Sequence, residues 1–120
     1  MNLYIFAEHD ELTDFSTELF AEIAAWAEPK TVLHAVLRTD ETDDAPVGNR
    51  EMDLGVEFTL SKTQKLKEPL NFLYPLAKKY KCEFVVGVID EGKYSDVCYF
   101  GFEEGRPDMF EIANYVGLES

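Results

Sequence analysis

Residues that build reactive or metal-binding centres are scarce in this chain of 120 residues, which has two cysteines and two histidines. His9 stands among acids that are its neighbours in sequence, and His34 stands in a predicted strand. Neither has the clustered partners that a zinc site or a catalytic histidine needs. CxxC, HExxH, GxSxG and phosphate-binding glycine motifs are all missing. We therefore expect no metal, no cofactor and no enzymatic activity.

Long apolar runs are missing too, because no run approaches the roughly 20 residues that span a bilayer. The start, Met1–Phe6, has no basic residue and is followed by acids, so it is typical of a first strand rather than of a targeting peptide. These features predict a cytoplasmic protein that does not bind membranes.

Disulfides are not expected from the two cysteines. If the hairpin predicted near residues 84–102 pairs Ile89 with Asp96, then Cys82 and Cys98 lie several residues out of register. That separation is too large for a disulfide without movement of the backbone. Two buried thiols are the simpler interpretation.

Basic residues are also few. The chain has 11 lysines and arginines and 24 aspartates and glutamates, so its net charge is −13. Residues 1–60 hold 14 acids and 3 bases, a balance of −11, whereas residues 61–120 hold 10 acids and 8 bases, a balance of −2. Such a field repels nucleic acid and speeds association with a basic partner. Solubility alone is the other explanation of this acidity.

The periodicity of the apolar residues predicts one α+β domain spanning residues 1–120, with elements in the order βαββαββα. We expect a two-layer sandwich in which helices pack on a mostly antiparallel five-stranded sheet, with a ferredoxin-like core extended by one strand and one helix. The expected strands are Leu3–Ala7, Thr31–Thr39, Leu54–Leu60, Phe84–Ile89 and Val97–Phe102, and the expected helices begin near Asp10, Ser61 or Pro69, and Pro107.

The prediction of the sheet starts from the stretch Cys82–Gly105. Its two apolar runs flank the polar segment Asp90–Asp96, which is a hairpin signal. Both runs are apolar on both faces, so the pair is predicted to lie centrally in the sheet. The strand Leu54–Leu60 alternates instead, and its outer face is predicted to face water.

The helix predicted over Asp10–Glu28 has an apolar face and an acidic face on opposite sides. Asp14, Glu18 and Glu22 stand four residues apart with no lysine between them, and such like-charge pairs cost a few tenths of a kcal/mol each. This face is either simply solvated or a binding site for cations. Residues 40–51 are predicted to form a long acidic loop, and the spacing of its acids does not match an EF-hand.

The segment Cys98–Asp108 reads CYFGFEEGRPD. In a small, strongly acidic α+β protein, it resembles the immunity proteins of bacterial contact-dependent growth inhibition and related polymorphic toxin systems. The resemblance implies a tight inhibitor of a cognate toxin, commonly a basic nuclease whose active site the inhibitor plugs or flanks. The same profile is similar to acidic inhibitors of ribonuclease E and to phage-encoded nucleic-acid mimics.

Our main hypothesis is an immunity protein that binds and neutralises a basic nuclease toxin through acids of its first half. The expected partner-binding residues are Glu11, Asp14, Glu18, Glu22, Asp40, Glu41, Asp43 and Asp44. The alternative is a small-molecule sensor or small enzyme with a pocket between sheet and helices. In that case Tyr94, Tyr99 and Tyr115 would line the cleft.

Overall fold

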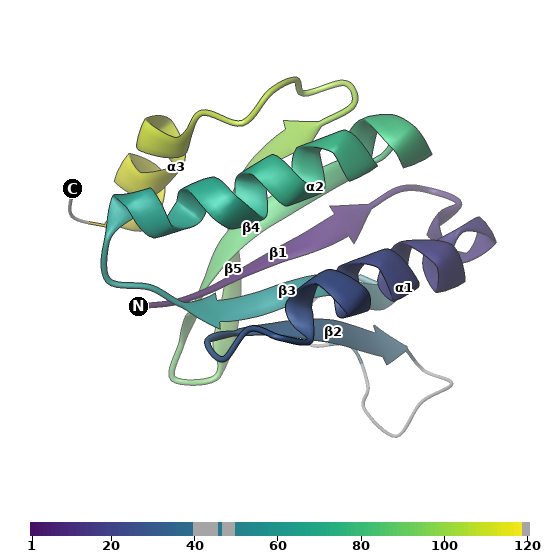
Figure 1. The fold of residues 1–120 in the computed structure, drawn as a ribbon. Coiled ribbons are helices and arrows are strands. Elements are labelled where there is room, and N and C mark those ends of the chain that lie inside the picture. Colours follow the sequence, from purple (N-terminus) through teal and green to yellow (C-terminus); the bar gives the residue numbers. More distant parts are fainter. Residues whose placement is uncertain (40–45, 47–49, 119–120) are drawn as a thin grey trace.

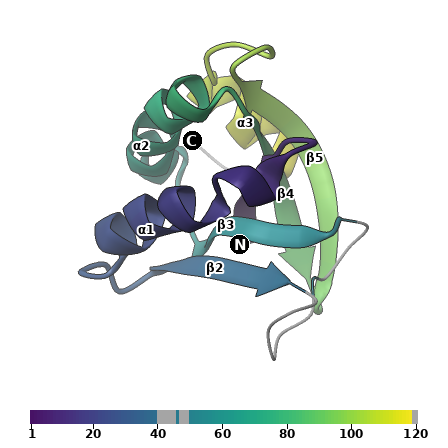
Figure 2. The same ribbon diagram turned by 90° about the vertical axis from the view of Figure 1, so that its right-hand side faces the viewer.

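The computed structural model describes residues 1–39, 46 and 50–118, and in this part of the chain three helices lie on one face of a five-stranded sheet (Figure 1). Figure 2 shows α1 and α2 on the same side of the strands. The strands are β1 (Asn2–Glu8), β2 (Leu33–Thr39), β3 (Met52–Thr59), β4 (Glu83–Asp90) and β5 (Lys93–Gly101). The helices are α1 (Ser16–Ala27), α2 (Lys67–Tyr80) and α3 (Met109–Val116), with 3₁₀ turns η1 (Leu12–Asp14) and η2 (Thr63–Leu66) before α1 and α2.

The sheet has the strand order β2-β3-β1-β4-β5, and all neighbouring strands are antiparallel. β3 lies between β1 and β2, so the unit β1–α1–β2 is split by another strand. The first four strands with α1 and α2 thus form the ferredoxin-like β-α-β-β-α-β arrangement, to which β5 and α3 are added. The predicted α+β sandwich and its element order are confirmed.

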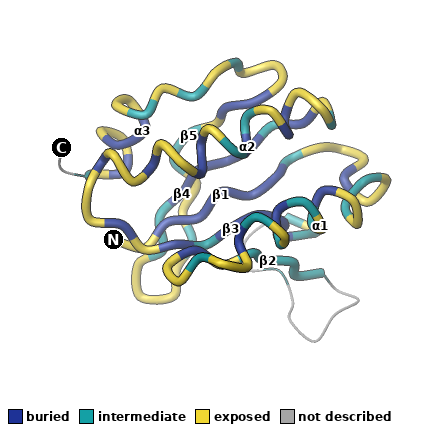
Figure 3. Tube along the Cα trace, viewed as in Figure 1, coloured by how far each residue is buried: buried dark blue, intermediate teal, exposed yellow. Residues whose placement is uncertain are grey.

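The main hydrophobic core lies between the sheet and the helices. β1 contributes Leu3 and Ile5, and α1 contributes Leu19 and Ile23, all fully buried. Figure 3 shows this pattern as a buried β1 and as helices that alternate between buried and exposed turns. The apolar face predicted for the first helix is therefore confirmed.

The first helix begins later than predicted. Residues 12–14 form η1, and α1 starts only at Ser16 with Phe15 as its N-cap, whose side chain makes no capping hydrogen bond. The start predicted at Asp10 is therefore too early, and no side chain caps α1. Leu12 is buried within η1 and ties this turn to the core.

The later helices have well-defined ends. α2 contains Pro69 and Pro75 and ends at Lys81, which adopts a left-handed conformation with φ 56°. η2 has Lys62 as its N-cap and no side-chain cap, and α2 begins at Lys67 rather than at Ser61, the earlier of its two expected starts. α3 begins after Asp108, whose carboxylate accepts hydrogen bonds from two backbone N–H groups, and it ends at Gly117 with φ 90°.

The hairpin differs from the prediction in position and in register. β5 is an edge strand, and only β4 is interior. Ile89 pairs with Tyr94 rather than with Asp96, because the strands extend to a two-residue turn at Glu91 and Gly92. Both turn residues have positive φ, 51° and 80°, as a tight hairpin turn requires.

A β-bulge shifts the register of the hairpin between Val86 and Gly87. Val86 pairs with Cys98 and Gly87 pairs with Asp96, so the bulged strand has one extra residue, Val97. Both Val97 and Cys98 pack against the main core.

Both cysteines are free thiols. Cys82 precedes β4 and is buried, and burial raises the pKa of its thiol to about 12. Burial likewise raises the pKa of Cys98.

Gly87 leaves the space that the ring of Tyr4 occupies. A Cβ atom at Gly87 would lie 2.2 Å from Cζ of Tyr4 and 2.4 Å from the carbonyl oxygen of Ser95. We therefore expect Gly87→Ala to lower the free energy of unfolding by about 1 to 3 kcal/mol, as overpacking does. Urea titration measures this change. Ser95→Ala, at an exposed neighbour, should change it by less than about 0.5 kcal/mol, and equal stability of Gly87→Ala and wild type would contradict the packing of Tyr4.

Candidate functional site

The face of the sheet that the helices leave uncovered carries a second, smaller hydrophobic core. It consists of Tyr4, Phe6 and Val85, each with 0% of its surface exposed. The rings of Tyr4 and Phe6 lie 4.7 Å apart, and the ring of Tyr94 lies 5.3 Å from that of Tyr4. Because no helix of the described chain packs on this core, other side chains must keep water away from it.

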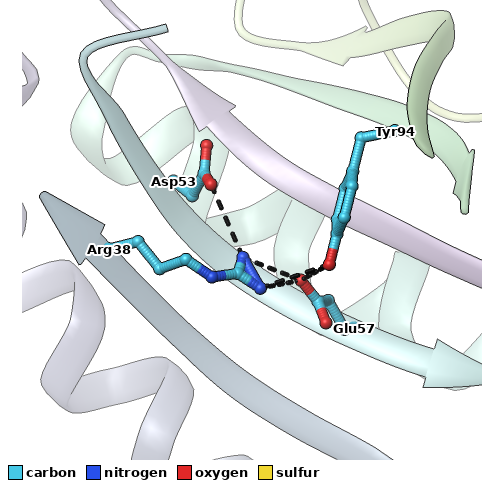
Figure 4. Close-up of polar contacts among 4 residues, drawn as sticks. All are labelled: Arg38, Asp53, Glu57 and Tyr94. Carbon is cyan, nitrogen blue, oxygen red and sulfur yellow. Dashed lines mark hydrogen bonds and ion pairs between the residues drawn. The ribbon is translucent and has the colours of Figure 1, made fainter. Parts of the chain in front are cut away.

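The first cover is a cluster around Arg38 (Figure 4). The guanidinium group donates to Glu57, with Nη1 at 2.9 Å from Oε2, and lies 3.5 Å from Oδ2 of the buried Asp53. The hydroxyl of Tyr94 donates to the same Glu57 oxygen at 2.8 Å and accepts from Arg38 at 3.3 Å. Residues of three strands, β2, β3 and β5, thus meet at one point.

The second cover is a cluster around Arg50, which precedes β3. Its Nη2 lies 2.8 Å from Oε1 of Glu8 and 2.8 Å from Oδ2 of Asp96. The other oxygen of Asp96 accepts a short hydrogen bond from the hydroxyl of Tyr4. The guanidinium carbon of Arg50 lies 5.8 Å from the centre of the Phe6 ring, so the cation also covers the apolar core directly.

The contacts of Tyr94 with Glu57 on β3 and with Arg38 on β2 require a strongly twisted sheet. On a flat sheet β5 would lie roughly 14 Å from β3, three strand spacings away, and farther still from the other edge strand, β2. That distance exceeds the reach of a tyrosine side chain. Figure 2 shows β2 and β5 running in clearly different directions. Gly87 pairs with Tyr4, and the absence of a side chain there leaves room for the tyrosine ring. Gly55 pairs with Phe6 and allows the backbone of β1 to approach closely, because a Cβ atom there would lie 1.9 Å from the carbonyl oxygen of Ile5.

The electrostatics of the two clusters favour protonated tyrosines and charged arginines. Burial, followed by the hydrogen bond to Glu57, raises the pKa of Tyr94 to about 12. Burial and the hydrogen bond to Asp96 raise the pKa of Tyr4 well above its usual range. Burial alone would lower the pKa of Arg50, but the bonds to Glu8 and Asp96 outweigh that and raise it.

Sequence analysis did not identify these residues as a site. The available signal was the placement of the few bases: two of the three bases in residues 1–60 are arginines beside predicted strands. The outer face of β3 was predicted to face water, and this is wrong, because Asp53 and Gly55 on that face are buried. A carboxylate that is buried or half-buried on a strand needs a cation nearby, and Arg38 supplies that cation for Asp53 and Glu57.

The predicted partner-binding acids fall into three groups. Glu11, Asp14 and Glu18 are exposed and make no ion pair within the described part of the chain. Glu22 differs, because it lies 2.9 Å from Nζ of Lys79 on α2 and accepts a short hydrogen bond from Tyr80. A cation therefore lies beside Glu22, on α2 rather than on α1, and the hydrogen bonds from Tyr80 and Lys79 lower the pKa of the Glu22 carboxyl group. The loop acids Asp40, Glu41, Asp43 and Asp44 lie outside the described residues.

An acidic depression lies where β1 runs into η1. It has a volume of about 600 Å³, and its polar lining includes Glu8, Asp10, Arg50 and Glu51. Glu8 and Arg50 pair with each other, whereas Asp10 and Glu51 form no ion pair with any described residue. Glu8 and Arg50 belong both to this depression and to the helix-free face, so the two surfaces are continuous.

The tyrosine cleft of the alternative hypothesis is not formed. Tyr94 lies on the helix-free face in contact with Arg38 and Glu57. Tyr115 is 60% exposed on α3, which packs on the opposite face of the sheet. The tyrosines therefore do not line a common pocket between sheet and helices.

Searches for other kinds of site gave two structural findings. Among the described residues, no group of three or more His, Cys, Asp or Glu side chains is placed to hold a metal ion. No helix in the described ranges has the length and apolar character needed to cross a membrane. Comparison of the chain with protein-family models, with curated proteins and with solved structures finds no match.

The raised pKa of Tyr94 predicts a loss of stability at alkaline pH. Tyrosine ordinarily titrates near pH 10, and Tyr94 titrates near 12 in the folded protein. Its contribution is therefore complete below about pH 10 and is lost as the pH rises through about 12. Tyr94→Phe should lower the free energy of unfolding by about 1 kcal/mol at pH 8 and should flatten the decline between pH 10 and 12. Urea titrations at pH 8 and pH 11 measure both effects.

Tyr115→Phe is the matched control for this experiment, because Tyr115 is exposed. It should leave both the stability and its pH dependence unchanged. If Tyr94→Phe lost stability with alkaline pH as steeply as the wild type, the contact between Tyr94 and Glu57 would not be the source of the effect.

Proposed function

We propose that the protein is an acidic immunity protein that binds a basic toxin domain, specifically a nuclease domain, and neutralises it in a one-to-one complex. The observation that carries this proposal is the group of acids around η1. Asp10, Glu11, Asp14 and Glu51 are exposed at one end of the molecule and form no ion pair within the described residues. We name these four residues the acidic end.

The contrast with other acids of the same half supports the proposal. Glu8, Asp53 and Glu57 are paired with arginines, and Glu22 is paired with a lysine. The acidic end holds its like charges together without such compensation, which is unfavourable for the isolated protein. A basic partner removes that repulsion on binding, so the arrangement is suited to association rather than to stability.

Inhibition by such a surface needs no chemical step. A nuclease binds phosphate through lysines, arginines or histidines, and carboxylates placed over those residues occupy the phosphate site. The net charge of −13 adds long-range attraction to a basic domain, which increases the association rate. We expect this rate to fall steeply as salt concentration rises.

Charge reversal tests the proposal. The variant Glu11→Lys, Asp14→Lys and Glu18→Lys reverses three exposed acids and spares Glu22, which has an internal partner. Because each desolvated pair at an interface centre contributes about 2 to 5 kcal/mol, we expect affinity for the cognate basic toxin domain to fall by about 100-fold or more. Titration at two salt concentrations measures affinity, and growth of cells expressing the toxin measures protection.

The matched control reverses three exposed acids elsewhere, Glu28, Asp90 and Glu111. It changes the net charge by the same amount, so any difference between the two variants reports the position of the charges. Circular dichroism confirms that both are folded. If both triple variants bind and protect as well as the wild type, these acids do not bind a toxin and the proposed function is wrong.

A further inference from the structure

We propose that the basic partner docks on the helix-free face of the sheet, with Tyr99 of β5 as an aromatic anchor for an arginine side chain of that partner. This inference rests on the proposed function in one respect, which is that the partner is basic. It adds the surface, the anchor residue and the kind of side chain recognised.

Tyr99 lies on the helix-free face. It pairs with Val85 of β4, whose side chain belongs to the small core on that face. The bulge at Val97 is the reason for this orientation: Val97 and Cys98 both pack toward the helices, and the extra residue returns the next side chain to the other face. The anchor position is thus set by the backbone of β5.

Tyr99 is also the exposed end of an apolar row whose middle is buried. In the register of the sheet, the row runs across the strands through Val36, Gly55, Phe6, Val85 and Tyr99. Phe6 and Val85 are fully buried, but Tyr99 is 47% exposed. Exposed tyrosines that adjoin a packed core are typical anchors of protein interfaces, because their rings bury a large area at low entropic cost.

Charge complementarity identifies the occupant. The two clusters on this face contain four carboxylates, Glu8, Asp53, Glu57 and Asp96, and two guanidinium groups. Burial, followed by the negative charges of Glu8 and Asp96, raises the pKa of the Tyr99 hydroxyl group. An aromatic face beside excess negative charge suits a planar cation, which can stack on the ring and pair with a carboxylate.

The face already contains an example of this recognition. Arg50 donates to Asp96 and Glu8 while its guanidinium group lies over the ring of Phe6. An arginine from the partner would repeat the arrangement two strands further out, over Tyr99. Because Glu8 and Arg50 also line the depression at the acidic end, a basic segment can contact both surfaces at once.

A deca-arginine peptide is the probe. We expect it to bind the wild type at 150 mM salt, and we expect the largest changes in amide chemical shift on β5 and β1. Tyr99→Ala should weaken binding by tenfold or more, whereas Tyr99→Phe, which keeps the ring, should stay within twofold of the wild type. Tyr115→Ala is the matched control, because Tyr115 is 60% exposed and lies on α3, and it should also stay within twofold.

Two results would overturn the inference. One is an equal effect of Tyr99→Ala and Tyr115→Ala on affinity, and the other is a set of shift changes centred on α1 rather than on β5. Neither result bears on toxin protection, which the charge-reversal variants test separately. Failure of the docking surface and failure of the proposed function are therefore distinguishable.

Discussion

The burial of Tyr4 and Phe6 on the face of the sheet without helices is the constraint on which the rest of the structure depends. β1 is the central strand and is apolar on both faces, so it needs cover on both sides. The helices supply one cover. The other consists of Arg38 and Arg50, which are held over the aromatic rings by carboxylates and by Tyr94. Charged side chains with long apolar stems can serve in this way because the stem packs on the core while the head is paired.

This cover has consequences for the shape and for the proposed activity. It joins both edge strands to the centre of the sheet, because Arg38 comes from β2 and Tyr94 and Asp96 come from β5. It also pairs four carboxylates with arginines, whereas the exposed acids of the acidic end form no ion pair among the described residues. A surface that is fixed by internal pairs loses little conformational entropy on binding, which favours a tight complex.

The sequence was informative where one local pattern determined the outcome. Apolar periodicity predicted the order of the elements and the buried face of α1. Prediction from the sequence failed where contacts between segments distant in the chain determined the structure. Two apolar faces suggested a central β5, but an edge strand has the same pattern here, because Val97, Cys98 and Phe100 pack on the main core and Tyr94 packs on the second core. The partner of Glu22, Lys79, is 57 residues away in sequence, and no spacing rule on α1 reveals it.

The central claim is that the ion pairs on the helix-free face couple the edge strands and protect the second core. A double-mutant cycle on Arg38 and Glu57 tests it most directly, with Arg38→Ala, Glu57→Ala and the double variant compared by urea titration. Both side chains are largely buried, 16% and 23% exposed, so the account predicts a coupling free energy of about 1 to 3 kcal/mol. A coupling free energy near zero, as for a fully solvated pair, would contradict the account.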